Sequence, residues 1–86
     1  DSLSASVLYE MWQGWGVALL GVSRATEAIE KFTRALEYRP QSDAGPYNQR
    51  GSAYTLLGDS DALRRALLDF ETATGIDPNF QRRTII

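Results

Sequence analysis

Few side chains in this chain could do chemistry, because its 86 residues contain no cysteine and no histidine. Zinc sites built on thiolates, disulfides, cysteine nucleophiles and histidine bases are therefore excluded. Asp59 and Asp61 form a carboxylate pair that could bind a cation, but they follow Gly58 in a polar cluster typical of a turn that caps a helix. The sequence contains no phosphate-binding glycine motif. We therefore predict that the protein is not an enzyme and has no catalytic, metal-binding or cofactor-binding residues and no cofactor.

The charge balance bears on the class of partner. Nine Lys and Arg stand against eleven Asp and Glu, which gives a net charge of −2. The basic pairs Arg64-Arg65 and Arg82-Arg83 are typical of solvated helix faces, and nucleic-acid binding depends on a basic surface. We expect no nucleic acid as a partner.

The apolar stretches are too short to cross a bilayer. The longest one without a charge runs over residues 11–23, below the roughly 20 apolar residues that a span needs. No basic segment followed by a cleavage motif opens the chain, which begins with Asp1 instead of Met and is expected to be processed or trimmed. We expect a soluble protein without a transmembrane segment, in an intracellular compartment or organelle.

The sequence contains an internal repeat, so the structural elements that position its side chains are expected to repeat as well. Apolar and small residues in the first part of the chain recur after 35 residues, and those in the following part recur after 38. The difference indicates three residues inserted in the second unit, at 59–61. The first set pairs Trp12, Gly16, Ala18 and Leu19 with Tyr47, Gly51, Ala53 and Tyr54. The second set pairs Ala25, Ala28, Ile29, Phe32, Ala35, Tyr38 and Pro40 with Leu63, Ala66, Leu67, Phe70, Ala73, Ile76 and Pro78.

The spacing within each unit is helical, since apolar residues recur at i, i+3, i+4 and i+7. The sequence predicts an all-α protein with four antiparallel helices over residues 5–21, 24–38, 46–57 and 61–74. Four sites mark their ends: Ser23 as an N-cap, Gly45 and Pro46 as N-cap and first helical residue, Gly58 closing the third helix, and Gly75 as a left-handed residue after the fourth. On the polar face of the second helix we expect the pairs Glu27–Lys31 and Glu30–Arg34.

This pattern resembles the tetratricopeptide repeat (TPR) over roughly residues 9–79. The first unit carries Trp12, Trp15, Gly16, Leu19, Ala28, Phe32, Ala35 and Pro40, and the second carries Tyr47, Gly51, Tyr54, Ala66, Phe70, Ala73 and Pro78. The resemblance implies a short α-solenoid with repeat 1 at about 9–42, repeat 2 at about 43–79, and a tail or the start of a missing capping helix at 80–86. The whole chain, 1–86, is then a single TPR-like domain.

Arg50 departs from the repeat, since the family usually has Leu there. A buried charge needs a partner, so we expect Arg50 to pair with Glu37 or Asp69. The glycines at 16 and 51 are expected to let paired helices approach closely around Phe32 and Phe70.

The resemblance also implies a concave groove lined by the first helix of each unit. Eight residues would face it: Glu10, Gln13, Val17, Leu20, Asn48, Gln49, Ser52 and Thr55. Members of the family that bind chaperone tails clamp a carboxylate with Lys and Asn, but Gln13 and Val17 stand at those positions and Gln49 replaces the next Asn. Recognition of an acidic tail is therefore not expected.

We expect a protein-interaction module, either a scaffold or an assembly factor, that binds a peptide or a partner protein through this groove or through its apolar end helices. Two alternatives stay open at this point: a structural subunit of a larger complex, which could be membrane-bound or organellar, and a homo-oligomer that self-associates through its uncapped ends.

Overall fold

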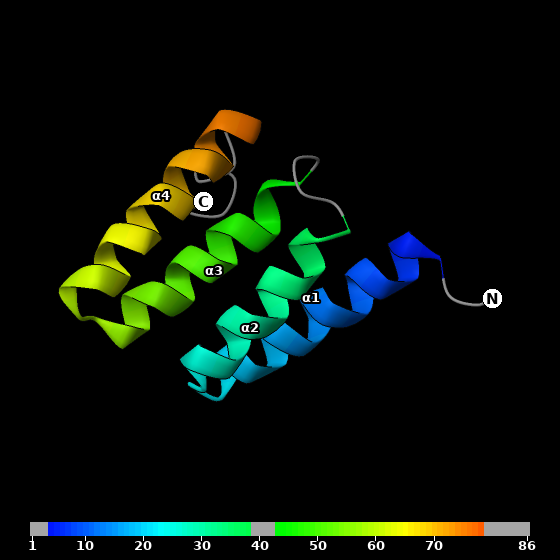
Figure 1. Cartoon of the computed structure of the whole chain (residues 1–86), viewed down its shortest axis with the longest axis horizontal. Helices are drawn as coiled ribbons and strands as arrows, with labels where there is room; N and C mark the ends of the chain where they lie inside the picture. The colour runs from blue at the N-terminus through cyan, green and yellow to red at the C-terminus, as the bar shows by residue number, and fades with distance from the viewer. Residues whose placement is uncertain (1–3, 39–42, 79–86) are drawn as a thin grey trace.

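The computed structural model describes residues 4–38 and 43–78, and within these ranges it contains four α-helices and no strand (Figure 1). The helices are α1 (Ala5–Gly21), α2 (Ala25–Leu36), α3 (Ala44–Leu57) and α4 (Ser60–Ile76). The predicted all-α fold class is confirmed. Pro40, the pair Arg82-Arg83 and the tail at 80–86 lie outside the described residues.

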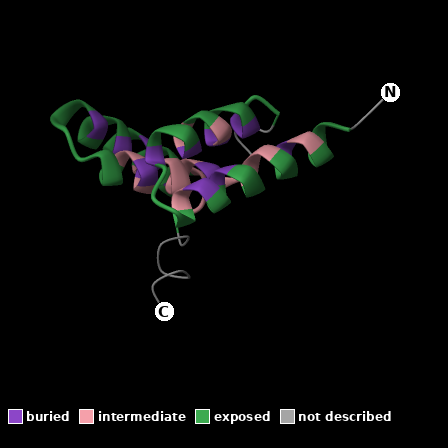
Figure 2. Ribbon diagram, turned by 90° about the horizontal axis from the view of Figure 1, so that it is seen from below, coloured by how far each residue is buried: buried purple, intermediate pink, exposed green. Residues whose placement is uncertain are grey.

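The helices pack in chain order. α1 packs on α2, α2 on α3, and α3 on α4, whereas α1 and α3 contact each other sparsely. The α1–α2 and α3–α4 turns lie at the same end of the molecule (Figure 1). Buried residues follow the sides of the helices that face one another, and exposed residues cover the outer sides (Figure 2).

Small residues set the helix spacing within each unit. A Cβ atom on Gly16 would stand 2.6 Å from the ring of Phe32, and one on Gly51 would stand 2.8 Å from the ring of Phe70. Both rings therefore occupy the space that a side chain on the facing helix would take. The predicted close approach at these two glycines is confirmed.

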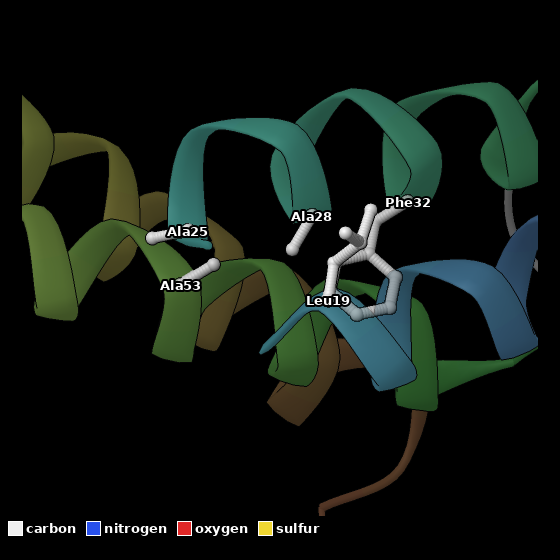
Figure 3. Packing of buried hydrophobic residues seen from close by; sticks show 5 residues of the cluster. All are labelled: Leu19, Ala25, Ala28, Phe32 and Ala53. Atoms are coloured by element: carbon white, nitrogen blue, oxygen red, sulfur yellow. The ribbon is translucent and has the colours of Figure 1, made fainter. Parts of the chain in front are cut away.

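The core between the units is built largely from alanines. Ala28 and Ala53 are fully buried, as is the Phe32 ring, and they form one cluster with Leu19 and Ala25. Figure 3 shows Ala25 of α2 and Ala53 of α3 beside each other, with the Phe32 ring next to Leu19 of α1. This cluster joins α1, α2 and α3, so α2 is packed on two sides.

The first turn differs from the prediction. Ser23 does not cap α2, because it adopts a left-handed conformation with φ of 63°, and Arg24 occupies the N-cap position without a side-chain bond. The N–H groups of Ser23 and Arg24 instead donate to the carbonyls of Leu20 and Leu19, which closes α1 in a Schellman motif. Ser23 is the repeat counterpart of Gly58, which has φ of 80° and closes α3 as predicted.

The third helix begins earlier than predicted. Asp43 is its N-cap, and the Asp43 carboxylate accepts a hydrogen bond of 2.9 Å from the Gly45 N–H. Pro46 is then the third helical residue. The prediction that Gly45 is the cap was wrong because an Asp two residues earlier supplies a side-chain acceptor, which Gly lacks.

The fourth helix is longer than predicted at both ends. Asp59 caps it by accepting from the Ala62 N–H at 2.8 Å, and Ser60 and Asp61 form its first turn, so the inserted residues extend the helix. Asp61 accepts a hydrogen bond from Arg65, and this contact lowers the pKa of the Asp61 carboxyl. Gly75 does not end the helix, because α4 continues to Ile76 and Asp77 closes it.

The charged face of α2 pairs differently from the prediction. Arg24 bonds to Glu27, and Arg34 lies 3.8 Å from Glu37. Lys31 does not pair with Glu27, because its ammonium lies over an indole ring of α1, as described below.

Candidate functional site

Six of the eight predicted groove residues occupy matching positions on the first helix of each unit. Gln13, Val17 and Leu20 of α1 recur after 35 residues as Asn48, Ser52 and Thr55 of α3. We call these eight side chains the groove row. Glu10 and Gln49 complete it.

The structure joins the two halves of the groove row at one point. The Gln13 side-chain amide donates a 2.5 Å hydrogen bond to Oε1 of Gln49, across the gap between α1 and α3. Gly45 lies beside this contact, since a Cβ there would stand 3.8 Å from Nε2 of Gln13. The Oε1 atom of Gln13 is itself buried and has no partner among the described residues. The pair therefore places an unused amide acceptor between the two helices.

A second bridge between the units was missed by the sequence analysis. The hydroxyl of Tyr9, a buried residue of α1, donates a 2.7 Å hydrogen bond to the carboxylate of Asp43. The same carboxylate group caps α3. The sequence analysis assigned no role to Asp43, and the signal that could have found it is its place as an acidic residue just before a helix.

The remaining members of the groove row differ in exposure and in the groups that they present to a ligand. Val17 is 42% exposed and presents an apolar surface, whereas Leu20 packs against the core cluster and is only partly available. The hydroxyls of Ser52 and Thr55 donate to carbonyls of their own helix, at 3.2 and 2.9 Å, so their oxygens remain as acceptors. Glu10 is exposed and Asn48 is half-buried.

Arg50 lies next to the row on α3 and is paired as predicted. Its guanidinium makes two hydrogen bonds of 2.8 Å to the carboxylate of Asp69 on α4, whose side chain is 6% exposed. A third bond of 3.1 Å reaches the Thr33 hydroxyl on α2. The contact with Asp69 raises the pKa of the Arg50 guanidinium against the opposing effect of burial. Arg50 therefore ties α3 to both neighbouring helices and is not free for a ligand.

The first unit uses other residues at the same two positions. Arg50 corresponds to Trp15, and Asp69 corresponds to Lys31. The Lys31 ammonium lies 4.0 Å from the centroid of the Trp15 ring, which stacks on Trp12 at 5.5 Å. A cation–π contact thus stands where the second unit has an ion pair. Both units therefore have a contact that involves a cation at these two positions. In the first unit the cation, Lys31, belongs to the second helix, and in the second unit the cation, Arg50, belongs to the first helix.

A surface hollow of about 370 Å³ lies away from the groove row. It opens at the turn end of the molecule, where the start of α2 meets the end of α3. Its lining includes none of the eight row residues, being formed by Ser23, Arg24, Ala25, Thr26, Glu27, Leu56 and Leu57.

Among the described residues, none of the helices combines the length and the apolar character that crossing a bilayer requires.

Comparison with known proteins gives one informative similarity. The chain is 43% identical over 61 residues to a curated protein of Caenorhabditis elegans, "Tetratricopeptide repeat protein 36". The matched region covers 71% of this chain and 32% of that protein, so the chain spans about a third of its relative. No family model matches the chain, and no solved structure matches it significantly. The similarity agrees with the TPR resemblance of the repeated residues: this chain is similar to a TPR protein.

Proposed function

We propose that this chain is a TPR-like protein-interaction module that binds an extended peptide segment along the groove row. The observation that supports the proposal is the Gln13–Gln49 contact, which joins two of the residues that the TPR resemblance implies for the groove. The similarity to a TPR protein supports a role in protein interaction in general. Binding would need no covalent chemistry.

The chemistry of the row favours a neutral or basic peptide. Glu10 is the one charged residue among the eight, so the row repels a terminal carboxylate. Amides at Gln13, Asn48 and Gln49 can pair with both the N–H and the C=O groups of an extended backbone. Val17 supplies an exposed apolar contact for one side chain of the peptide.

We expect a bound peptide to donate a hydrogen bond to Oε1 of Gln13, which has no partner among the described residues. A buried acceptor without a partner costs roughly 1–3 kcal/mol. Because this oxygen is buried in the free protein, the Gln13 side chain would have to turn toward the groove for a peptide N–H to supply that partner. Binding is thus expected to be favoured by a hydrogen bond that the free protein lacks.

The test uses peptides selected on the wild-type protein from a phage-displayed library of random sequences. Replacing Val17 with Asn removes the exposed apolar contact of the row without adding a charge. We expect this variant to bind the best selected peptide at least about tenfold more weakly, as measured by isothermal titration calorimetry.

Val7→Asn is the matched control, because Val7 is also on α1 and is 44% exposed, close to the 42% of Val17. It lies outside the row and should leave the affinity unchanged. Equal affinities for the wild type and the Val17 variant would refute the groove as the binding surface, as would a library that yields no peptide specific for the folded protein.

A further inference from the structure

Several positions that pack within a unit are buried alike in the two units. Gly16 and Gly51 are both buried. Ala35 is 0% exposed and its counterpart Ala73 is 1% exposed. Residues that are buried at the α2–α3 interface behave differently, because their counterparts in the other unit are exposed.

These differing positions fall on one face of α3 and one face of α2. On α3, Pro46 and Ala53 are fully buried, whereas their α1 counterparts, Met11 and Ala18, are exposed. Met11 is 53% exposed, and Trp15 between them on the same face is 51% exposed.

The interface residues of α2 are likewise more buried than their counterparts on α4. Ala25 is 7% exposed and Ile29 is half-buried, because α3 covers them. Their α4 counterparts, Leu63 and Leu67, are 47% and 57% exposed. Met11 and Ala18 on α1, and Leu63 and Leu67 on α4, therefore correspond to the two sides of the α2–α3 interface. Among the described residues, no helix covers either set.

We define these surfaces as the α1 face (Met11, Trp15, Ala18) and the α4 face (Leu63, Leu67). We propose that the α4 face of one molecule packs on the α1 face of a second copy of this chain, in the arrangement that joins α2 to α3. The proposal is independent of the peptide groove. The faces differ from each other, so the contact is head-to-tail, and the unused face at each end can bind a further copy.

Polar side chains at the edge of the two faces are complementary in charge. Across the α2–α3 interface, Thr33 accepts a hydrogen bond from Arg50. The counterpart of Thr33 on α4 is Glu71, and the counterpart of Arg50 on α1 is Trp15, which lies under the Lys31 ammonium. In the head-to-tail contact the Glu71 carboxylate of one copy would lie near the Trp15 ring of the other and near its Lys31 ammonium, which in its own molecule is 3.9 Å from the Glu30 carboxylate.

Two side chains of the open faces are larger than their counterparts in the interface they repeat, since Leu63 replaces Ala25 and Met11 replaces Pro46. Leu67 and Ile29 have the same volume. The two larger side chains hold the helices of the two copies farther apart than α2 and α3, and they bring more apolar surface to the contact, which favours association. We expect reversible assembly whose mean size grows with protein concentration.

The test uses two variants that each remove one face. Ala18→Arg places a long cation at the centre of the α1 face, and Leu67→Arg does so on the α4 face. Both residues are exposed and Arg is a good helix former, so both variants should fold, which circular dichroism checks. By sedimentation velocity across a concentration series, the wild type should form dimers and larger species, and each variant should stay monomeric.

Mixing the two variants gives the decisive measurement. The Ala18 variant keeps its α4 face and the Leu67 variant keeps its α1 face, so an equimolar mixture should form a 1:1 dimer and nothing larger. Val17→Arg and Leu68→Arg, each next to a substituted residue but off the two faces, should assemble as the wild type does. A monomeric wild type at every concentration overturns the proposal, as do variants that self-associate alone, a mixture that stays monomeric, or controls that lose assembly.

Discussion

The Gly16–Phe32 contact shows how a single missing side chain sets the spacing of two helices. The Phe32 ring is fully buried and fills the space over Gly16, and Phe70 does the same over Gly51. Interiors packed this densely do not absorb an added methyl group without movement of a neighbour.

Replacing Gly16 with Ala should therefore destabilise the protein. The new Cβ would stand 2.6 Å from the ring, and overpacking of this kind costs about 1–3 kcal/mol, more than the helix propensity that Ala gains. Gly14→Ala is the matched control in the same helix, because a Cβ at Gly14 meets no atom within 4 Å. It should stabilise the protein by about 0.5–1 kcal/mol. Urea denaturation measures both changes, and destabilisation of equal size in the two variants would contradict the role assigned to Phe32.

Arg50 and Asp69 act as one unit, since each satisfies the charge of the other in a partly buried place. Asp69→Ala should lower the free energy of unfolding by about 2–3 kcal/mol, because it leaves the guanidinium without its carboxylate. The double variant Arg50→Met with Asp69→Leu should lie within about 1 kcal/mol of the wild type, because no charge is left unpaired. Additive losses in a double-mutant cycle, measured by urea denaturation, would show that the two residues are not coupled.

At the scale of the elements, the two hairpin turns use one backbone conformation with different residues. Ser23 and Gly58 are separated by the 35-residue offset and both have positive φ, 63° and 80°. Only the second turn has the residue that adopts this conformation without a steric cost.

Exchanging these residues should move the stability in opposite directions. Ser23→Gly should stabilise the protein by up to about 1 kcal/mol, and Gly58→Ser should destabilise it by about 1–2 kcal/mol. Thermal unfolding followed by circular dichroism measures both. A loss of stability in the Ser23 variant would mean that its side chain has a role beyond the turn.

The sequence predicted the helices well and their ends less well. Helix existence follows from apolar spacing, which repeats in both units, whereas an end depends on competition between nearby capping residues. Ser23 was expected to cap α2, but the closing bonds of α1 required a left-handed residue at that place. Asp43 caps α3 instead of Gly45, because the Asp43 carboxylate accepts a hydrogen bond from the Gly45 N–H.

Only part of the candidate site could be predicted from the sequence, because some of its contacts depend on how the helices pack. That Arg50 pairs with an acidic residue, either Glu37 or Asp69, followed from the need to compensate a buried charge, and the structure shows that the partner is Asp69. The Gln13–Gln49 and Tyr9–Asp43 contacts depend on how α1 sits against α3, and neither helix periodicity nor the repeat offset contains that information.

At the scale of the whole molecule, α2 and α3 form the centre of the part that the structure describes and α1 and α4 its edges, because α2 and α3 each pack extensively against two described helices. Repeat architectures of this kind derive their stability from contacts between adjacent units. The large exposed side chains on the two edge helices follow from that arrangement, and the head-to-tail assembly is its expected consequence at high concentration.

The placement of Trp12 and Trp15 gives the first unit an optical signal of its own. Both tryptophans of the chain lie in α1 and stack on each other, so indole fluorescence reports on the first unit alone. Far-ultraviolet circular dichroism reports on all four helices together. Denaturation curves from the two methods will coincide if the units unfold as one, and a first unit that loosens on its own will separate them. The native protein can thus report the cooperativity of its own repeats without an added label.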